Sequence, residues 1–392
     1  MSISYWNSAS DKKKIETDFL VIGGGIAGLS SAYWLEKKFP TSKIALIERH
    51  KIGSGASGRN AGFVTCGSSE HFAKLVTDFG PEKAIEIWKF SEQNRELLKS
   101  EVIKGNADKL LFGSTGSCTV AASDADYSRY ITLADTMAKL GIDVELINEA
   151  KIKSDYAVKG FKGGIEYKHD GEVHPILLLK ELRSLLKNTE IIEDQEICKM
   201  ESDAGVYCET QHLRIQSQKV LVTLNGYLGL FWPNWEKLVR PQRGQVIVTE
   251  PLPKRVKGPC YLTKHLCYFR QMPTGELLIG GFRNLDLENE NTYSDQVSEK
   301  IQKALFDFTK DFFDFTADAK IKNQWSGIMG FTPDGQMIIG EAPQFKNVHL
   351  MAGCSGHGMG LSFHAAKVLV ESLNDERAIP SHLGLNRYLA ML

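Results

Sequence analysis

Three glycines near the start of the chain have a spacing that can bind an anion. They form Gly23-Gly-Gly25-Ile-Ala-Gly28, which follows an apolar run at residues 18–22 and precedes a helical pattern at residues 29–37. In a G-x-G-x-x-G turn the first glycine permits a tight reversal, the second lets a pyrophosphate approach the backbone, and the third packs helix against strand. Free N–H groups at the helix N-terminus then bind the phosphates. The spacing predicts a dinucleotide site that includes Gly23, Gly25, Ile26, Ala27 and Gly28.

An acidic residue stands where such a site needs one. A second β-rich run at residues 44–47 leads into Glu48, which lies about 20 residues after Gly28. A carboxylate at this place accepts hydrogen bonds from the ribose of the adenosine half. Strand, glycine turn, helix, second strand and acid therefore predict a Rossmann unit, although this order alone does not distinguish NAD from FAD.

A loop of small residues follows and favours a flavin. Residues 52–62 read Ile-Gly-Ser-Gly-Ala-Ser-Gly-Arg-Asn-Ala-Gly. A backbone this bare can run close along a flat ring system and its ribityl chain, with Ser57 and Asn60 offering polar contacts. A flexible linker has the same composition, and that alternative stays open for the loop taken alone.

With these motifs the chain resembles the superfamily of FAD-dependent amine and amino-acid oxidases, which includes D-amino acid oxidase, glycine oxidase and sarcosine oxidase. The wording of residues 56–62, with Ser-Tyr-Trp at residues 4–6, looks closest to the γ-glutamylputrescine oxidase branch. Further segments resemble the family and occur in its order: a strand ending near Asn225, Trp-Ser-Gly…Thr-Pro-Asp-Gly at 325–335, and a second glycine loop at 353–360. The resemblance spans nearly the whole chain and implies FAD as the cofactor. The Cys through which sarcosine oxidase tethers its flavin aligns with about Gly327 here, so this departure favours FAD held non-covalently.

The second glycine loop also has a physical interpretation of its own. It opens a helical segment, so its N–H groups and the positive end of the helix dipole are directed at an anion. Reduced flavin is an anion at its N1–C2=O edge, which such a loop would stabilise; an ordinary glycine turn that caps a helix is the alternative. Besides the first motif, the predicted cofactor contacts are Glu48, Arg49, Ala56, Ser57, Asn60, Ala61, Gly62, Ile197, Gly327, Gly356, His357, Gly358, Met359 and Gly360.

The expected fold class is α/β, with a Rossmann-like FAD-binding domain and an α+β substrate domain that has a mainly antiparallel sheet. A chain of 392 residues exceeds the usual size of one hydrophobic core, so two domains are expected. Residues 190–197 are expected to hold the third Rossmann strand. The FAD-binding domain is predicted at 1–75, 150–235 and 321–392, and the substrate domain at 76–149 and 236–320.

Composition excludes several classes of protein. Forty-seven basic and 48 acidic residues give a formal net charge of −1, which is no electrostatic footprint for nucleic acid. No apolar run approaches the ~20 residues that a membrane span needs. The seven cysteines are odd in number and form no C-x-x-C pair, so we expect reduced thiols in a cytoplasmic protein and no metal site.

The substrate contacts are expected on the second domain, because in this family its sheet covers the flavin. Tyr268, Arg270 and Arg283 lie on suitable strands, and Trp325 is expected at the flavin edge. Alternating Tyr and Arg on a half-exposed sheet are more often plain surface residues.

Departures from the family bear on the substrate. Its carboxylate-binding Arg and Lys align with Met329 and Gly360, which favours an amine without an adjacent carboxylate, or an acid held by another cation such as Arg283. Where oxidases of the family often carry a Lys near flavin N5, this chain has Leu278, which weakens the oxidase interpretation.

The predicted reaction is oxidation of the C–N bond of a small amine or amino acid to an imine by hydride transfer to flavin N5. Oxygen or an unidentified acceptor would reoxidise the flavin. The alternatives are an FAD-dependent 2-hydroxy-acid dehydrogenase, for which no histidine is convincingly placed as base, a flavoprotein acting on a tRNA aminomethyl group, and a non-enzymatic scaffold.

Overall fold

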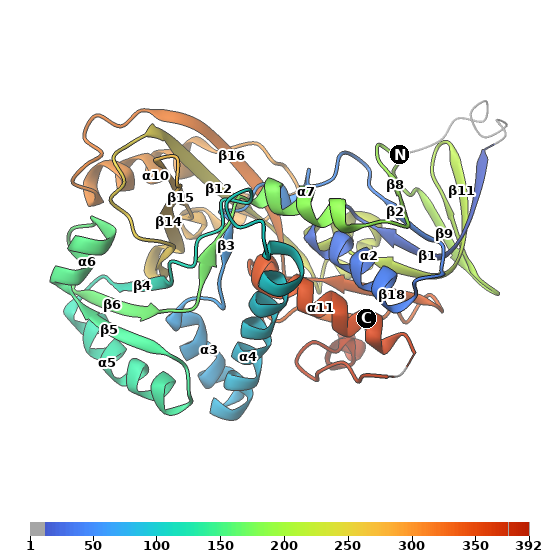
Figure 1. Cartoon of the computed structure of the whole chain (residues 1–392), viewed down its shortest axis with the longest axis horizontal. Helices are drawn as coiled ribbons and strands as arrows, with labels where there is room; N and C mark the ends of the chain where they lie inside the picture. The colour runs from blue at the N-terminus through green and yellow to red at the C-terminus, as the bar shows by residue number, and fades with distance from the viewer. Residues whose placement is uncertain (1–11, 375, 392) are drawn as a thin grey trace. The chain divides into compact units, whose positions relative to one another are not determined.

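The computed structural model describes residues 12–374 and 376–391, so the Ser-Tyr-Trp opening lies outside the described residues. The chain forms two compact units, each assembled from separate stretches of sequence (Figure 1). Unit 1 comprises Met1–Gly58, Ile176–Pro241 and Met329–Leu392, and unit 2 comprises Arg59–Pro175 and Gln242–Ile328. Residues 59–75 and 150–175, which the sequence assigned to the FAD-binding domain, thus belong to unit 2.

Unit 1 is built on a sheet with a parallel centre. Its strand order is β17-β18-β11-β1-β2-β8, and β9 and β10 extend it from the other half of β11. Neighbouring strands from β18 to β8 run parallel, whereas β17 and β10 run antiparallel to their partners. The strands are β1 (Lys13–Ile22), β2 (Ile44–Ile47), β8 (Thr189–Ile192), β9 (Lys199–Ser202), β10 (Val206–Glu209), β11 (Leu213–Val222), β17 (Ile338–Glu341) and β18 (Val348–Ala352).

The predicted Rossmann unit is the β1-α2-β2 segment, and β8 pairs with β2 as the third strand. Strand β2 and the C-terminal half of β1 are buried on both faces, as an apolar strand inside a parallel sheet must be. Three helices lie on one face of this sheet, as Figure 1 shows: α2 (Ile26–Lys38), α7 (Pro175–Leu185) and α11 (Gly358–Ser372). The short α8 (Leu228–Phe231) follows β11.

Unit 2 contains a sheet of order β16-β12-β15-β14-β13-β4-β6-β5 and a two-stranded ribbon of β3 and β7. Except for the parallel pair β13–β4, the registers that join β12 through β5 are antiparallel, in line with the expected sheet. The strands are β3 (Phe63–Val64), β4 (Ser117–Ala121), β5 (Val144–Asn148), β6 (Gly163–Tyr167), β7 (Gly171–Glu172), β12 (Arg240–Pro251), β13 (Cys260–Leu262), β14 (Cys267–Gln271), β15 (Glu276–Gly280) and β16 (Ile321–Phe331).

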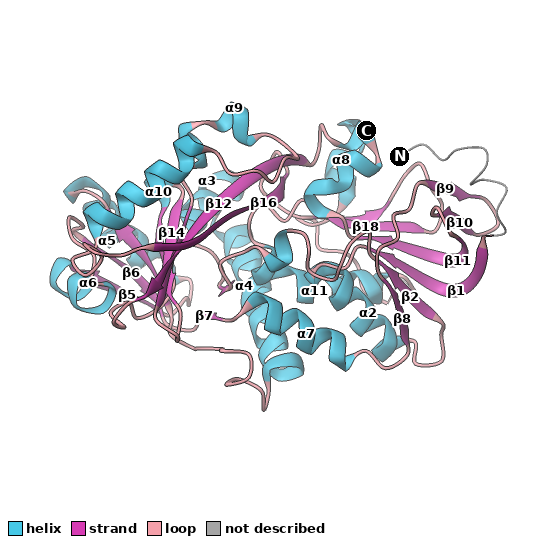
Figure 2. Ribbon diagram, turned by 90° about the horizontal axis from the view of Figure 1, so that it is seen from above, coloured by secondary structure: helices cyan, strands magenta, loops and turns pink. Residues whose placement is uncertain are grey.

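The helices of unit 2 cover this sheet. On one face α10 packs Ile301, Leu305 and Phe308 against Phe269 and Ile279 of β14 and β15 (Figure 2). The helices are α3 (Ser69–Phe79), α4 (Pro81–Leu98), α5 (Asp124–Lys139), α6 (Glu149–Tyr156), α9 (Leu287–Glu290) and α10 (Glu299–Phe312).

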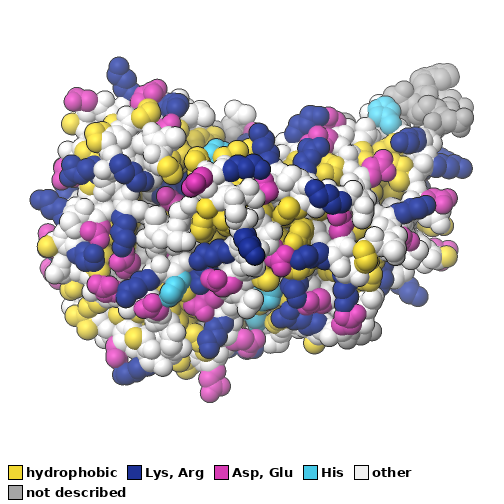
Figure 3. Space-filling view, in the orientation of Figure 1, with side chains coloured by type: hydrophobic (Ala, Val, Ile, Leu, Met, Phe, Trp, Pro, Cys, Tyr) yellow, Lys and Arg dark blue, Asp and Glu magenta, His cyan; other side chains and the backbone are white. Residues whose placement is uncertain are grey.

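The described residues show the mixed surface charge and the lack of long apolar helices that the composition predicts. On the face seen in Figure 3, basic and acidic side chains alternate instead of gathering by sign. Within residues 12–374 and 376–391, every helix is too short or too polar to cross a bilayer.

Candidate active site

Three predicted segments that are far apart in sequence meet at one edge of the unit 1 sheet. Strands β1, β2 and β18 belong to one parallel array, and each ends directly before a predicted cofactor segment. The first glycine turn follows Ile22, Glu48 follows Ile47, and the second glycine loop follows Ala352. The carboxyl edge of a parallel sheet is where such folds bind their ligands.

The first glycine turn has the close packing that the motif requires. Gly23 has a φ of 110°, and a Cβ on Gly28 would overlap the carbonyl oxygen of Gly23. No side chain of the N-cap residue Gly25 blocks the start of α2, and a Cβ there would stand 2.9 Å from Ser57 Oγ. Ile26 donates its N–H to the same Ser57 hydroxyl at 2.9 Å. A bare helix N-terminus beside a serine hydroxyl fits a pyrophosphate.

Glu48 is held in place by two backbone donors. Its Oε2 accepts the N–H of Gly24 at 2.7 Å, and its Oε1 accepts the N–H of His50 at 2.9 Å. Each carboxylate oxygen has a second lone pair for a ribose hydroxyl. The neighbouring Arg49 lies over the ring of Tyr227 at 4.6 Å and pairs with Glu196 at 3.8 Å. Arg49 and Tyr227 therefore pack together next to Glu48.

We expect Glu48→Ala to weaken FAD binding at least about tenfold, because the variant loses hydrogen bonds from ribose to a charged group, each worth about 1.5–3 kcal/mol. Flavin fluorescence titration of the apoprotein measures the dissociation constant. The control is Glu209→Ala, because Glu209 pairs with Lys12 and Arg214 at the amino end of β11. An unchanged FAD dissociation constant in Glu48→Ala would contradict the assignment.

The second glycine loop is fixed by left-handed backbone conformations and by hydrogen bonds that its N–H groups donate to neighbouring residues. Gly353, Ser355 and Gly356 have φ values of 72°, 49° and 86°, and helix α11 begins at Gly358 without a side-chain cap. Cys354 N–H donates to Asn225 Oδ1 at 3.0 Å, and Ser355 N–H donates to Gly330 O at 2.8 Å. The helix start is therefore oriented at the carboxyl edge of β18, where it can bind an anion.

The remaining predicted cofactor residues divide between the units. Ala56 lies in a 3-10 turn, Ile197 is in the core of unit 1, and Met359 and Gly360 are buried in the first turn of α11. His357 Nδ1 lies 3.0 Å from the carbonyl oxygen of Ser355, so its ring contacts the backbone of the second glycine loop. Four predicted contacts lie in unit 2: Asn60, Ala61, Gly62 and Gly327.

The predicted substrate residues Tyr268 and Trp325 share one face of the unit 2 sheet. Both pack on a cluster of Ala61, Val246, Val248 and Leu278. Tyr268 pairs with Gly280 across β14 and β15, and its ring fills the space that a Cβ on Gly280 would need. Trp325 donates its indole N–H to Arg59 O at 2.8 Å, which fixes the ring beside the 59–62 loop.

Arg283 does not lie on a strand as predicted: it opens the 3-10 turn Arg283–Leu285 after β15, and its charge interacts with Tyr268. Burial raises the pKa of the Tyr268 phenol to about 12, and the positive charge of Arg283 partly opposes that rise. Burial lowers the pKa of Arg283 from its ordinary value, and Tyr268 partly offsets this effect. A cation and a phenol that interact electrostatically and are both desolvated can bind a carboxylate by charge-assisted hydrogen bonds.

Arg270 lies on β14, as expected, and its guanidinium has an ion-pair and a hydrogen-bond partner within unit 2. Its side chain is 3% exposed, lies 3.5 Å from Glu172 and donates to Val173 O at 3.0 Å. Gly62, with a φ of 76°, passes close to it, since a Cβ on Gly62 would stand 2.9 Å from Arg270 Nη2. Arg270 thus packs against Gly62 of the 59–62 loop and pairs with Glu172 as its counter-ion.

Sequence reasoning missed the residues that hold the β3–β7 ribbon against this face. Phe63 of β3 meets Tyr261 and Tyr268 edge-on at ring distances of 5.2 and 5.6 Å. The Thr65 and Tyr261 hydroxyls lie 2.5 Å apart. Asp170, just before β7, is fully buried and accepts the Ser117 hydroxyl at 2.7 Å and the Cys66 N–H at 3.1 Å.

Burial raises the pKa of Asp170 to about 7, although Ser117 and Arg95 oppose that rise. A carboxyl with a raised folded-state pKa stabilises the fold below its unfolded pKa of ~3.9, and this contribution is lost as pH rises through about 7. We expect the unfolding free energy of the wild type to fall relative to Asp170→Asn, by up to about 4 kcal/mol, between pH 4 and 8. Urea unfolding of both proteins across this range measures the difference, and parallel pH profiles would contradict it.

The comparisons with known proteins agree with this geometry. A family model described as FAD dependent oxidoreductase matches residues 18–372. The chain is 24% identical to "Probable oxidoreductase OrdL" of Haemophilus influenzae over 382 residues, 92% of this chain and 84% of that protein. It is also 24% identical to the "Gamma-glutamylputrescine oxidoreductase" of Escherichia coli strain K12, over 95% of this chain and 89% of that one.

Solved structures show the same fold. Glycine oxidase from Geobacillus kaustophilus superimposes with a TM-score of 0.78 at 19% identity, covering 95% of this chain and 98% of that chain. L-proline dehydrogenase from P. horikoshii gives a TM-score of 0.76 at 17% identity, covering 93% and 95%. The expected α/β fold is confirmed, and the family match over residues 18–372 shows that the chain belongs to the FAD dependent oxidoreductases, enzymes that use FAD.

Proposed function

We propose that the enzyme oxidises the C–N bond of a small amine or amino acid to an imine. The observation that carries this proposal is the substrate wall of unit 2, the apolar cluster on which half-buried Tyr268 and Trp325 pack, with the half-buried Arg283 interacting electrostatically with Tyr268. The names of the similar proteins support it, because γ-glutamylputrescine oxidoreductase, glycine oxidase and L-proline dehydrogenase all act on substrates with a C–N bond.

The residues of the chain divide the work between them. Bound FAD supplies the hydride acceptor. Gly25, Ser57 and Glu48 would hold its pyrophosphate and ribose in unit 1. In unit 2 the apolar cluster around Leu278 would exclude water from the substrate, which favours a precisely oriented C–H bond over hydrolytic side reactions. No acid or base from the chain is needed if the amine enters neutral.

Arg283 bears on the class of substrate. Met329 and Gly360 favoured an amine without an α-carboxylate, and left open an acid held by Arg283. We propose the second alternative, a carboxylate-bearing amine, because Arg283 and Tyr268 interact on the substrate wall and both can donate hydrogen bonds to a carboxylate.

The test begins with the purified protein. We expect a yellow protein whose FAD is released by acid precipitation, because the residues predicted to hold the cofactor include no cysteine that could tether the flavin. Sarcosine, dimethylamine, glycine and lactate are then added anaerobically, and flavin absorption is followed. Bleaching by an amine or amino acid supports the proposal, bleaching by lactate alone supports a 2-hydroxy-acid dehydrogenase, and colour that stays with the precipitate contradicts non-covalent binding.

A further inference from the structure

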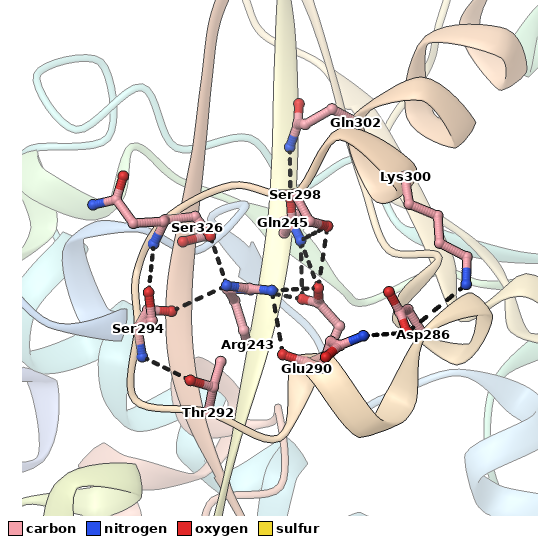
Figure 4. A network of polar contacts seen from close by, with 12 residues as sticks. Arg243, Gln245, Asp286, Glu290, Thr292, Ser294, Ser298, Lys300, Gln302 and Ser326 are labelled. Atoms are coloured by element: carbon pink, nitrogen blue, oxygen red, sulfur yellow. Dashed lines mark hydrogen bonds and ion pairs between the residues drawn. The ribbon is translucent and has the colours of Figure 1, made fainter.

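A buried carboxylate outside the predicted site organises the segment that follows β15. Glu290, at the end of α9, is fully buried. Its carboxylate oxygens accept hydrogen bonds from Arg243 Nε and Nη2 at 2.9 and 2.7 Å. They also accept two from Gln245 Nε2 at 2.8 and 3.0 Å. Figure 4 shows both donors, which are neighbours on one face of β12, pointing at this carboxylate.

The same two side chains bind the backbone of the segment. Arg243 donates to the carbonyl oxygens of Gln296 at 2.7 Å and Asn289 at 3.3 Å. Gln245 Oε1 accepts the N–H of Ser298 at 2.9 Å. Residues 283–298, which we call the strap, are thus clamped to β12 along their second half.

Near its C-terminal end, the strap is linked to the substrate wall through Arg59. Asp295 Oδ2 accepts Arg59 Nη1 at 2.9 Å, and Arg59 also donates to Ser326 O at 3.0 Å. Arg59 O in turn accepts the indole N–H of Trp325. The strap begins at Arg283, directly after the turn at Gly281 and Phe282, whose φ values are 128° and 61°. One end of the strap therefore carries Arg283, and the other fixes Arg59 and Trp325.

The clamp lies on the face of the sheet opposite to the substrate wall. Arg243 and Gln245 alternate along β12 with Val246 and Val248, which belong to the cluster of Tyr268 and Trp325. A buried ion pair contributes little net stability compared with apolar side chains, but removing one partner costs several kcal/mol. A clamp of this kind is thus better suited to fixing one conformation than to raising stability.

We propose that Glu290 is a positioning residue for the substrate wall, which sets Arg283 at one end of the strap and the Arg59–Trp325 contact at the other. This inference rests on the proposed function for its meaning, since the wall is the candidate substrate site. It assigns specificity to a side chain that does not itself touch the wall.

Two variants of the FAD-loaded full chain test it. Glu290→Gln keeps the shape of the clamp and leaves Arg243 without its counter-ion. Asp295→Asn cuts only the outer ion pair, which is 32% and 45% exposed, so its effect on folding stability is small. The control is Glu166→Gln, which removes a buried carboxylate of unit 2 that binds Lys257 and Tyr156.

The first measurement is amide hydrogen exchange, which needs no substrate. Exchange in residues 59–62 is expected to rise about tenfold in both Glu290→Gln and Asp295→Asn and to stay at the wild-type rate in Glu166→Gln. Unchanged exchange in residues 59–62 in Glu290→Gln would overturn the proposal, and so would an equal rise in the control.

The second measurement is anaerobic flavin reduction by sarcosine. In Glu290→Gln the apparent dissociation constant of sarcosine is expected to rise about tenfold or more, with a change of less than about threefold in the limiting reduction rate. A loss of thermal stability with wild-type sarcosine constants would show a purely structural role and overturn the inference. If the wild-type flavin is not reduced by sarcosine or any other amine, the proposed function fails, and hydrogen exchange alone decides whether Glu290 holds the wall.

Discussion

Gly28→Ala is expected to lower FAD affinity about a hundredfold or more. A Cβ at Gly28 would overlap the carbonyl oxygen of Gly23 and stand 2.9 Å from Thr223 Oγ1. The Gly23 carbonyl belongs to the glycine turn itself, and the Thr223 hydroxyl is held by its hydrogen bond to Ile22 O at 2.8 Å, so α2 must move from β1. Overpacking of this kind costs about 1–3 kcal/mol, and the displaced helix also carries its N–H groups away from the pyrophosphate.

The matched control for this variant is Gly384→Ala. Gly384 lies in the same unit, has no positive φ, and has its nearest neighbours at 3.8 Å, so an added methyl group makes ordinary van der Waals contacts. FAD titration of the two refolded apoproteins gives the comparison, and circular dichroism checks that each is folded. Equal FAD affinities would mean that the turn can absorb a methyl group and that the packing argument is wrong.

Arg283→Ala is expected to separate two substrate classes. If the guanidinium binds a substrate carboxylate, removing it leaves a buried anion without its cation, at a cost of about 2–5 kcal/mol. The second-order rate constant of flavin reduction by sarcosine should then fall about 30-fold or more. Dimethylamine, which differs from sarcosine by the carboxylate alone, should react at an unchanged rate.

The control variant is Arg255→Ala, because Arg255 is an exposed arginine of the same unit that lies over Phe315. Stopped-flow reduction without oxygen measures the wild type and both variants with each of the two substrates. If dimethylamine reduces the wild type as fast as sarcosine does, and Arg283→Ala changes neither rate, the substrate is an amine without an α-carboxylate, as the sequence first favoured.

Local signals made the cofactor edge predictable. The glycine turn, strand β2 and Glu48 follow one another within about 30 residues, and each has a residue type that its backbone conformation demands. The Gly23 φ of 110° and the Glu48–Gly24 hydrogen bond follow from that order. The second glycine loop could be placed beside them because any Rossmann-type sheet brings the carboxyl ends of its parallel strands together.

Long-range pairings were not predictable in the same way. The ribbon of β3 with β7 is two residues long on each side and has no periodic pattern, yet it places residues 59–75 in unit 2. Glu290 stands in a polar stretch typical of a surface loop, and its burial is explained by Arg243 and Gln245, 47 and 45 positions earlier. The ion pair of Arg270 could not be predicted for the same reason, since its counter-ion Glu172 is distant in sequence.

The order in which the sheet of unit 1 is synthesised constrains when this enzyme acquires its cofactor. Strand β1 leaves the ribosome with β2 as a neighbour, but its other partner β11 comes about 200 residues later, on the order of ten to forty seconds at usual elongation rates. Strand β18 and the second glycine loop come later still, within the last 45 residues of the chain. A nascent chain therefore exposes an apolar strand edge during most of its synthesis, which invites chaperone binding. If FAD binding needs the second glycine loop, a chain cut before Gly353 is expected to stay colourless, because it lacks that loop.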